Sequence, residues 1–229
     1  MVCFLNYICP HHFVHYNTMP KLTADDLIYG YVNGIFPMAD TDDTLYWYSP
    51  DPRAIIPLDT YKPPKSLRPL LNQQVFKIRI DTDFEGVMRG CALPRGNDDC
   101  TWISEEIIAA YTDLHKMGFA HSVEVYDQDS LVGGLYGVSV GSAFFGESMF
   151  HRVSNASKVA FHYLVQILKQ QGFEMLDTQF INDNVRRFGA IEIPKLEYMK
   201  LLKRAIGKKA RFVESPLQVL YTAGLQVSN

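Results

Sequence analysis

The chain is poor in the features that mark metal-binding, secreted and membrane-spanning proteins. Its four cysteines, Cys3, Cys9, Cys91 and Cys100, show no paired short spacing, which excludes a zinc signature and a secreted disulfide framework. No apolar run approaches the roughly 20 residues that a helix needs to cross a bilayer. The first 18 residues lack the basic start and clean apolar run of a signal peptide. We therefore expect a reduced, cytoplasmic protein that does not enter a membrane.

The chain also lacks a global excess of positive charge. A net charge of -3 on 229 residues offers no overall attraction to nucleic acid or anionic lipid. The cations are unevenly placed: residues 61–80 contain five and no acid, and residues 185–211 contain nine against two acids. Such segments are typical either of a solvated helix face or of a local surface for a polyanion. The composition therefore permits polyanion binding only at particular surfaces.

The order of the expected strands and helices predicts a mixed sheet. The hydrophobic share of 47% is ordinary for a folded protein, and apolar residues predict strands over 122–126, 131–140 and 143–150. A helix with a buried stripe then runs to Gln171, and a strand over 175–181 follows it. A run of strands followed by a strand–helix–strand unit is typical of a mixed sheet with helices on its faces. We therefore predict an α/β (α+β) fold.

Two proline-containing stretches set the expected domain limits. In residues 46–53 two prolines exclude a helix and a central strand, which indicates a rigid loop. The pair Pro63-Pro64 is typical of a linker. We therefore expect a disordered extension over residues 1–18, a small N-terminal domain over 19–62 and a larger second domain over 63–229.

The strand expected over residues 175–181 carries two polar side chains on one face. Because side chains alternate along a strand, Asp177 and Gln179 share a face, and Leu176 and Thr178 take the other. An acid beside an amide can hold a polar substrate group between an acceptor and a donor. The same pair could equally hydrogen-bond a neighbouring loop, and this strand alone does not decide between the two.

A second carboxylate, Glu147, stands in an apolar strand. On regular alternation Glu147 and Met149 share one face, which suits an apolar ligand that carries a positive amino group. A carboxylate at its usual pKa is a poor base at neutral pH, so burial would have to raise that pKa for Glu147 to accept a proton. Glycines at Gly133, Gly134 and Gly137 remove side chains from a neighbouring strand, which either admits a ligand or makes a bulge. We expect the site to work without a metal.

Seven short strings, taken in order, are similar to those of the leucyl/phenylalanyl-tRNA–protein transferase family. The resemblance covers about residues 22–202, and so many motifs in one order are highly specific. The strings are GYVNGIFPM at 30–38, WYSPDPR at 47–53, GGLYG at 133–137, FGESMF at 145–150, NASK at 155–158, LDTQF at 176–180 and FGA at 188–190.

The resemblance implies a small N-terminal domain followed by a GNAT-like acyltransferase domain whose mixed sheet is flanked by helices. It implies an enzyme that moves leucine, phenylalanine or, in some members, methionine from aminoacyl-tRNA to a protein that begins with Arg or Lys. The acceptor's α-amine attacks the ester carbonyl at the tRNA 3′ end, and the product carries an N-terminal degradation signal. Because the activated ester drives the reaction, the resemblance implies no cofactor. We expect a monomer that acts in the cytoplasm.

The resemblance also assigns site residues by position. Asp177 and Gln179 match the catalytic pair of the family, and Glu147 matches the carboxylate near the reacting amine. Asp177 either polarises Gln179 or mainly holds charge and orientation. Trp102 and Tyr48 match aromatic residues near the terminal adenosine, where they would stack on a base. The positions that line the amino-acid pocket are matched by Leu135, Phe144, Met149, Phe161, Leu164, Leu176 and Thr178.

Two departures from the family pattern and two alternative functions stand beside this reading. Tyr48 takes the place of a usual second tryptophan and would stack less strongly. Residues 61–80 are less basic than in typical members, so affinity for the tRNA backbone is either lower or rests more on residues 195–211.

An acyl-CoA transferase would need a glycine-containing pyrophosphate loop before a helix, and residues 152–157 lack those glycines. A non-catalytic RNA-binding module would bind tRNA without forming a peptide bond.

Overall fold

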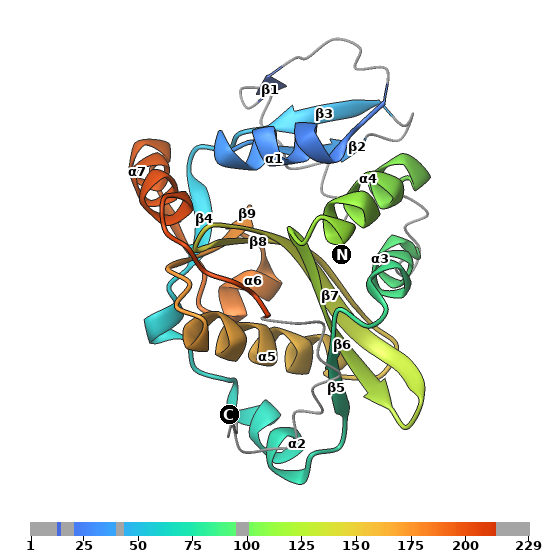
Figure 1. Ribbon diagram of the computed structural model, residues 1–229. Helices are drawn as coiled ribbons and strands as arrows, with labels where there is room; N and C mark the ends of the chain where they lie inside the picture. The colour runs from blue at the N-terminus through green and yellow to red at the C-terminus, as the bar shows by residue number, and fades with distance from the viewer. Residues whose placement is uncertain (1–12, 15–20, 40–43, 95–100, 214–229) are drawn as a thin grey trace.

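The computed structural model describes residues 13–14, 21–39, 44–94 and 101–213 (Figure 1). The strands span β1 Phe13–Val14, β2 Phe36–Ala39, β3 Leu45–Tyr48, β4 Arg53–Ile56, β5 Lys77–Ile80, β6 Ala120–Asp127, β7 Ser130–Val140, β8 Ala143–His151, β9 Met175–Gln179 and β10 Ile191–Ile193. The helices span α1 Ala24–Val32, α2 Arg68–Gln73, α3 Phe84–Ala92, α4 Glu105–Lys116, α5 Ala156–Gln170, α6 Asp183–Arg187 and α7 Lys195–Ile206.

The described strands form a small sheet and a large mixed sheet. The small sheet has the order β1-β3-β2, and the large one has the order β10-β4-β9-β8-β7-β6-β5. Neighbours in the large sheet are antiparallel except β8 and β9, which run parallel because α5 connects them. Helix α5 covers one face, and α1, α3, α4 and α7 lie on the other (Figure 1). The prediction of a mixed sheet flanked by helices is confirmed.

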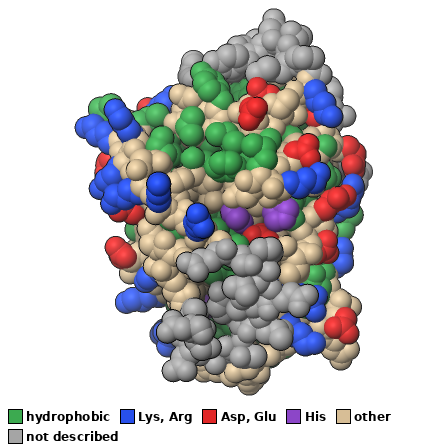
Figure 2. All heavy atoms as spheres, viewed as in Figure 1, with side chains coloured by type: hydrophobic (Ala, Val, Ile, Leu, Met, Phe, Trp, Pro, Cys, Tyr) green, Lys and Arg blue, Asp and Glu red, His purple; other side chains and the backbone are tan. Residues whose placement is uncertain are grey.

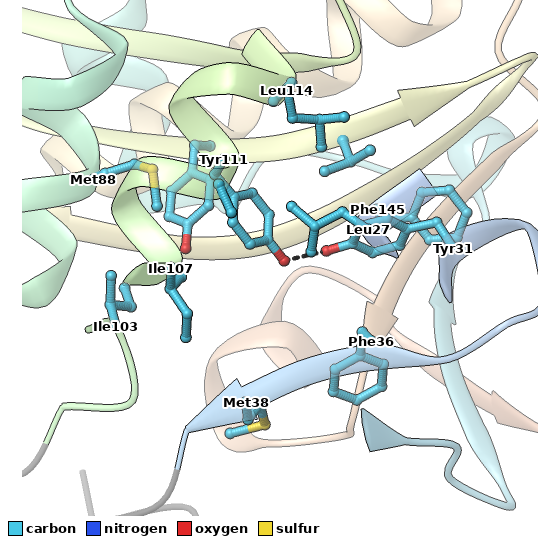
Figure 3. Close-up of a cluster of buried hydrophobic side chains, with 14 of the residues drawn as sticks. Leu27, Tyr31, Phe36, Met38, Met88, Ile103, Ile107, Tyr111, Leu114 and Phe145 are labelled. Carbon is cyan, nitrogen blue, oxygen red and sulfur yellow. Dashed lines mark hydrogen bonds between the residues drawn. The ribbon is translucent and has the colours of Figure 1, made fainter. Parts of the chain in front are cut away.

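The large sheet separates two apolar cores. The first core joins α1, α3, α4 and α7 to the sheet and contains Leu27 and Ile107 (Figure 3). The second core joins α5 to the opposite face and contains Leu164. Alternation along β8 sends Phe144 into the second core and Phe145 into the first, so one strand anchors both. Burial of these apolar surfaces supplies most of the driving force for folding.

Side-chain caps determine where two of these helices begin. The Thr23 side chain accepts the backbone N–H of Asp26, and the Asp26 carboxylate accepts that of Thr23, which starts α1. Asp83 caps α3 by accepting the N–H of Gly86, because the Thr82 side chain is hydrogen-bonded to the buried carboxylate of Glu124 instead.

The large sheet crosses the domain limit expected at Pro63-Pro64. Strand β4 lies in the segment assigned to the N-terminal domain, but it pairs with β9 on one side and β10 on the other. The N-terminal segment therefore contributes a strand to the interior of the second domain's sheet. The hydrophobic run Ala54–Ile56 after Arg53 is compatible with this strand, but the prolines that precede Arg53 are more typical of a loop.

One further expectation differs from the structure, and another falls largely outside its description. Residues 46–48, expected in a loop, belong to β3, because the prolines come only after Tyr48. The extension expected over residues 1–18 lies outside the described residues except for β1, which pairs with β3.

Candidate active site

Three side chains from three elements converge on the Glu147 carboxylate beside the first core. Tyr31 of α1 and Gln179 of β9 donate hydrogen bonds to Oε1 of Glu147 at 2.7 and 2.8 Å. Tyr111 of α4 donates to Oε2 at 3.4 Å. The hydroxyls of Tyr31 and Tyr111 are also hydrogen-bonded to each other (Figure 3). Oε2 of Glu147 therefore has only one long hydrogen bond among the described residues.

A β-bulge aims Glu147 at this network. Its neighbours Gly146 and Ser148 pair with two consecutive residues of β7, so Glu147 has no partner across the strands. An extra residue of this kind shifts the alternation of the strand. Glu147 consequently faces α1 and α4, whereas Met149 packs against the second core. The prediction that Glu147 and Met149 share a face is wrong for this reason.

Asp177 is fully buried and has its hydrogen-bonding capacity filled. Nε of Arg53 donates to both carboxylate oxygens at 3.0 and 3.2 Å, and Nη2 donates to Oδ2 at 2.7 Å. The Tyr198 hydroxyl donates to Oδ2 at 2.7 Å, and the Gln179 backbone N–H donates to Oδ1 at 2.8 Å. Asp177 thus contacts the backbone of Gln179 rather than its amide side chain. This arrangement favours a role in charge and orientation over polarisation of the Gln179 amide.

Arg53 is buried between two aromatic rings. Its guanidinium carbon lies 4.6 Å from the ring centre of Phe36 and 4.7 Å from that of Tyr198, and Nη1 donates to the carbonyl of Gly34 at 3.2 Å. Burial by itself lowers the pKa of Arg53, but the charges of Asp177, Tyr198 and Glu147 and the hydrogen bonds to Asp177 together outweigh it and raise that pKa. Arg53 is 1% exposed, so the pair with Asp177 is a buried salt bridge.

Gln179 ends β9 in an unusual backbone conformation. Its φ of 65° lies in the left-handed region that non-glycine residues seldom adopt. The hydrogen bond from its N–H to Asp177 stabilises this turn, and its side chain then reaches Glu147. The turn also places Phe180 against Phe36 of the first core, where regular alternation would have put it on the opposite face.

The Glu147 carboxyl has a pKa suited to proton transfer. Burial raises this pKa from 4.5 to about 7, although the hydrogen bonds from Tyr31 and Gln179 act in the opposite direction. Burial also raises the pKa values of Tyr31 and Tyr111, and the Glu147 charge adds to both shifts, so the two phenols stay protonated donors. Glu147 can therefore gain or lose a proton near neutral pH.

Solvent reaches the middle of the large sheet next to Glu147. Pairing between β8 and β9 ends at Phe145 and Asp177, and the next four residues of β8, 146–149, are half-buried. A Cβ added to Gly146 would meet only the carbonyl oxygen of Asp177, at 3.5 Å, which is an ordinary contact. Partial exposure of four consecutive residues in the interior of the sheet makes this end of β8 the candidate place for contact with a ligand.

The residues predicted to line an amino-acid pocket lie on the other face of the sheet. Met149 is half-buried, and the Thr178 hydroxyl donates to the carbonyl of Ala54 at 3.3 Å. A ligand could therefore contact both Glu147 and the predicted pocket residues only where the pairing between β8 and β9 ends. The fully buried members of the set pack in the second core around α5 and are Leu135, Phe144, Phe161, Leu164 and Leu176.

The two aromatic residues expected near adenosine differ in accessibility. Trp102 is half-buried at the edge of the first core, before α4. Tyr48 is 1% exposed; its ring stacks on Phe36 with centroids 6.0 Å apart and meets Phe180 edge-on. A base could reach Trp102 with little rearrangement, whereas stacking on Tyr48 would require its neighbours to move.

The three glycines of β7 make room for the protein itself. A Cβ at Gly133 would lie 2.6 Å from Cβ of Ala156 in α5, and one at Gly137 would lie 2.3 Å from the carbonyl oxygen of Phe145. A Cβ at Gly134 would lie 3.0 Å from the carbonyl oxygen of Val123 in β6. Chain atoms therefore occupy the space that the sequence offered to a ligand.

Four residues of this network were missed by the sequence analysis as site residues. Tyr31 and Tyr111 lie in apolar helix stripes, which are typical of core residues, and the motif strings assign no role to Tyr198 or Arg53. The chemistry of these side chains could have identified them, because a buried phenol or guanidinium needs a hydrogen-bonding partner. An arginine that directly precedes an apolar run, as Arg53 does, was the most visible case.

The described part of the chain contains neither a cluster of metal-binding side chains nor a membrane-spanning helix. No group of three or more His, Cys, Asp and Glu side chains lies together there as a metal site would require. Likewise, no helix in those ranges is both long enough and apolar enough to cross a bilayer.

Comparison with known proteins identifies the family. The family model described as leucyl/phenylalanyl-tRNA protein transferase matches residues 55–203, and the model of its N-terminal domain matches residues 21–51. The chain is also similar to a solved structure, L-PGS from Bacillus licheniformis, with 13% identity and a TM-score of 0.44 over 81% of this chain and 71% of that one.

Curated relatives match over most of the chain. The leucyl/phenylalanyl-tRNA–protein transferase of Chlorobium phaeobacteroides is 52% identical over 193 residues, which are 84% of this chain and 100% of the relative. That of Chlorobium limicola is 49% identical over 82% of this chain and 97% of its own length, and that of Prosthecochloris aestuarii is 49% identical over 84% and 100%. The chain therefore belongs to the leucyl/phenylalanyl-tRNA–protein transferase family.

Proposed function

We propose that this protein transfers leucine, phenylalanine or methionine from aminoacyl-tRNA to the N-terminus of proteins that begin with Arg or Lys. The product gains a bulky N-terminal residue that serves as a degradation signal. The observation that carries the proposal is the meeting of the Glu147 and Gln179 side chains at the half-exposed end of β8, in a chain of this family. An ionisable group and an amide donor thus stand together where a substrate can enter.

The proposed reaction is an aminolysis of an ester. The acceptor's neutral α-amine attacks the carbonyl carbon at the tRNA 3′ end, so a C–N bond forms and the C–O bond to the ribose breaks. Glu147 accepts the proton that the amine loses, and the departing ribose oxygen takes up a proton to become a hydroxyl. The pKa of Glu147, raised to about 7, supports this role. The ester is activated, so the residues only position groups and transfer protons.

Asp177 acts in this proposal as a positioning residue. Arg53 balances the charge of its carboxylate. The Tyr198 hydroxyl and the Gln179 N–H donate to the remaining acceptor positions, so no lone pair is left for a substrate amine. What it contributes is the turn that holds the Gln179 amide beside Glu147. Gln179 then orients the carboxylate or the reacting amine through its own hydrogen bonds.

The aminoacyl side chain is proposed to enter the opening beside Gly146 and contact Met149. Leu135, Phe161 and Leu176 would form deeper walls, since they are buried in the core directly behind. Trp102 is the more accessible of the two aromatic residues for stacking on the terminal adenosine. Widening the pocket at Met149 or Phe161 should shift the preference among leucyl-, phenylalanyl- and methionyl-tRNA.

The acceptor's cationic side chain is proposed to approach Glu147 rather than Asp177. Arg53 already balances the charge of Asp177, whereas the described cations leave Glu147 without an ion pair. A peptide that begins with Arg or Lys therefore brings the missing positive charge. Specificity for basic N-termini would follow from this imbalance.

The deciding experiment is incubation with radiolabelled Leu-tRNA or Phe-tRNA and an Arg-starting peptide. We expect label in the peptide, and none when its α-amine is acetylated or when Glu147→Ala replaces the native chain. The leucyl/phenylalanyl-tRNA–protein transferase of Chlorobium phaeobacteroides, assayed in parallel, is the positive control. Absence of transfer by this chain, under conditions where that relative labels the peptide, would contradict the proposal.

We also propose that the protein is a monomer and acts in the cytoplasm, where aminoacyl-tRNA is made. Light scattering coupled to size exclusion should give a mass near 26.1 kDa. A mass twice as large would contradict the first part.

A further inference from the structure

Helix α7 presents a row of cations to solvent. Lys200 and Lys203 are exposed on the helix, and Lys209 and Arg211 are exposed in the segment that follows it. None of these four lies within ion-pair distance of a carboxylate in the described ranges. In Figure 2 the Lys and Arg side chains gather over α7, at the upper left of the molecule. Such a ridge on a protein with a net charge of -3 is a local site of positive potential.

Two more cations of the ridge are held in place. Arg204 donates to Glu174 at 3.2 Å, and Lys208 forms an ion pair with the same carboxylate. One acid thus balances two cations, which keeps both side chains on this surface and leaves it positive. Glu197 is the exposed acid within α7 itself.

The opposite face of the same helix belongs to the candidate active site. Tyr198, Leu202 and Ala205 are buried against the sheet, and the Tyr198 hydroxyl donates to Asp177. The cations are therefore part of a rigid element that contacts the catalytic centre. At 1.5 Å per residue the 12-residue helix is about 18 Å long, enough to follow several nucleotides that lead away from the site.

The second basic segment of the chain lies elsewhere. Lys62, Lys65 and Arg68 are exposed around α2, which Figure 1 places at the far end of the molecule from α7. Of the other two cations in this segment, Lys77 pairs with Asp129 and Arg79 lies over the ring of Tyr126. No element of this segment supplies a residue to the Glu147 network. The two basic segments can thus be separated by experiment.

We propose that the exposed cations of α7 and of residues 207–211 form the surface that holds the phosphate backbone of the aminoacyl-tRNA. The 3′ end enters beside Glu147, and the strand behind it runs along α7. This inference rests on the proposed function for the identity of the RNA. The segment around α2 contributes little to the affinity.

The test is a variant that carries Lys200→Ala, Lys203→Ala, Lys209→Ala and Arg211→Ala together. With Leu-tRNA as the donor we expect KM to rise about tenfold or more, because each lost phosphate contact weakens binding. With 3′-O-leucyl-adenosine as the donor, which has no phosphate backbone, kcat/KM should stay as in the native chain. The matched control is Lys62→Ala with Lys65→Ala and Arg68→Ala, which should leave both donors unaffected.

Binding of uncharged tRNA provides a readout that needs no transfer. The logarithm of its affinity should fall with the logarithm of salt concentration, and the α7 variant should lower this slope by up to about 3 for four lost contacts. An equal effect of the α2 control, or an unchanged slope in the α7 variant, would overturn the inference. If the native chain transfers nothing yet loses tRNA affinity in the α7 variant, the proposed function fails and this inference stands. Should the fourfold variant misfold, Lys200→Gln with Lys203→Gln should give about half the effect.

Discussion

Arg53 and Asp177 are both withdrawn from water, and each compensates the charge of the other. The guanidinium lies between two aromatic rings, and the carboxylate accepts hydrogen bonds from Arg53, Tyr198 and the Gln179 backbone. A buried ion pair is weak evidence for stability by itself, but loss of one partner leaves an unpaired charge in the core. Substitution of Asp177 therefore affects folding as well as transfer.

The first prediction concerns Asp177→Ala. We expect the free energy of unfolding to fall by about 3–5 kcal/mol, because Arg53 is left buried without its counter-ion. Urea denaturation followed by circular dichroism measures this change. The matched control is Glu85→Ala, which breaks the exposed pair with Arg89 and should leave the unfolding midpoint almost unchanged. Similar small losses in both variants would refute the buried-pair account.

The second prediction concerns Glu147→Gln and the pH dependence of transfer. If ionised Glu147 accepts the amine proton, native activity below pH 7 should fall about tenfold per pH unit more than protonation of the acceptor amine alone makes it fall. The variant should show low activity without that pH step, which a pH–rate profile at saturating tRNA will test. A profile of the variant that keeps the native step near pH 7 would assign the titration to another group.

The same carboxyl makes stability depend on pH. The folded-state pKa of Glu147 is raised from 4.5 to about 7, so folding favours the protonated form. The stabilisation that the protonated Glu147 carboxyl gives the folded state is fully present below pH 4.5 and is lost as pH rises toward 7. Across that window the free energy of unfolding of the native chain should decline more steeply than that of Glu147→Gln.

Among the elements, β7 and β8 define the site by their irregular pairing. The bulge at Glu147 turns its side chain toward α1 and α4, and the pairing of Gly137 with Gly146 places two glycines opposite each other beside it. The two glycines differ in their surroundings. Phe144 and Phe145 crowd Gly137, whereas a Cβ added to Gly146 would meet only the carbonyl oxygen of Asp177 in β9, at 3.5 Å.

The third prediction compares these two glycines. Gly137→Ala should destabilise the fold by about 1–3 kcal/mol, because its Cβ would overlap the Phe145 carbonyl oxygen at 2.3 Å. Gly146→Ala should leave the thermal midpoint nearly unchanged, since its Cβ makes one ordinary contact. Equal shifts of the two midpoints would contradict the packing described for β7.

Helices α1 and α4 act on the site through their tyrosines, which is the basis of the fourth prediction. The hydrogen bond from Tyr31 lowers the pKa of Glu147, so Tyr31→Phe should raise it and move the pH midpoint of transfer upward. Tyr111→Phe is the matched control, since its 3.4 Å contact is longer and should give a smaller shift. An unchanged midpoint in Tyr31→Phe would exclude this coupling.

For the whole molecule, the N-terminal segment and the large sheet are interdependent. Strand β4 lies between β9 and β10, and α1 packs against α4 in the first core. Arg53, which neutralises Asp177, also comes from this segment. The site is therefore completed by residues on both sides of the expected domain limit.

The fifth prediction follows for a fragment of residues 63–229. Without β4 and α1 it loses an interior strand and one wall of the first core, so we expect no cooperative thermal unfolding. Differential scanning calorimetry of the fragment and of the full chain measures this directly. A cooperative transition near that of the full chain would mean that the second domain folds alone.

Local patterns in the sequence predicted most strands and helices of the second half, because their periods depend only on neighbouring residues. Alternation predicted β6, β7 and β8, and the helix stripe predicted α5. It failed at Glu147, since a bulge changes the alternation without a mark in the sequence. It also failed at Arg53, whose strand is stabilised by partners more than 120 residues away.

The sequence by itself determined the family, the mixed sheet and the presence of two carboxylates and an amide near the end of the sheet. Only the tertiary structure decided that burial raises the pKa of the Glu147 carboxyl to about 7. Asp177 is neutralised by Arg53 from a distant strand, whereas Glu147 is surrounded by phenols and an amide that carry no charge. The pKa of a carboxyl depends on the charges and the burial around it, and these arise from long-range contacts that no local pattern contains.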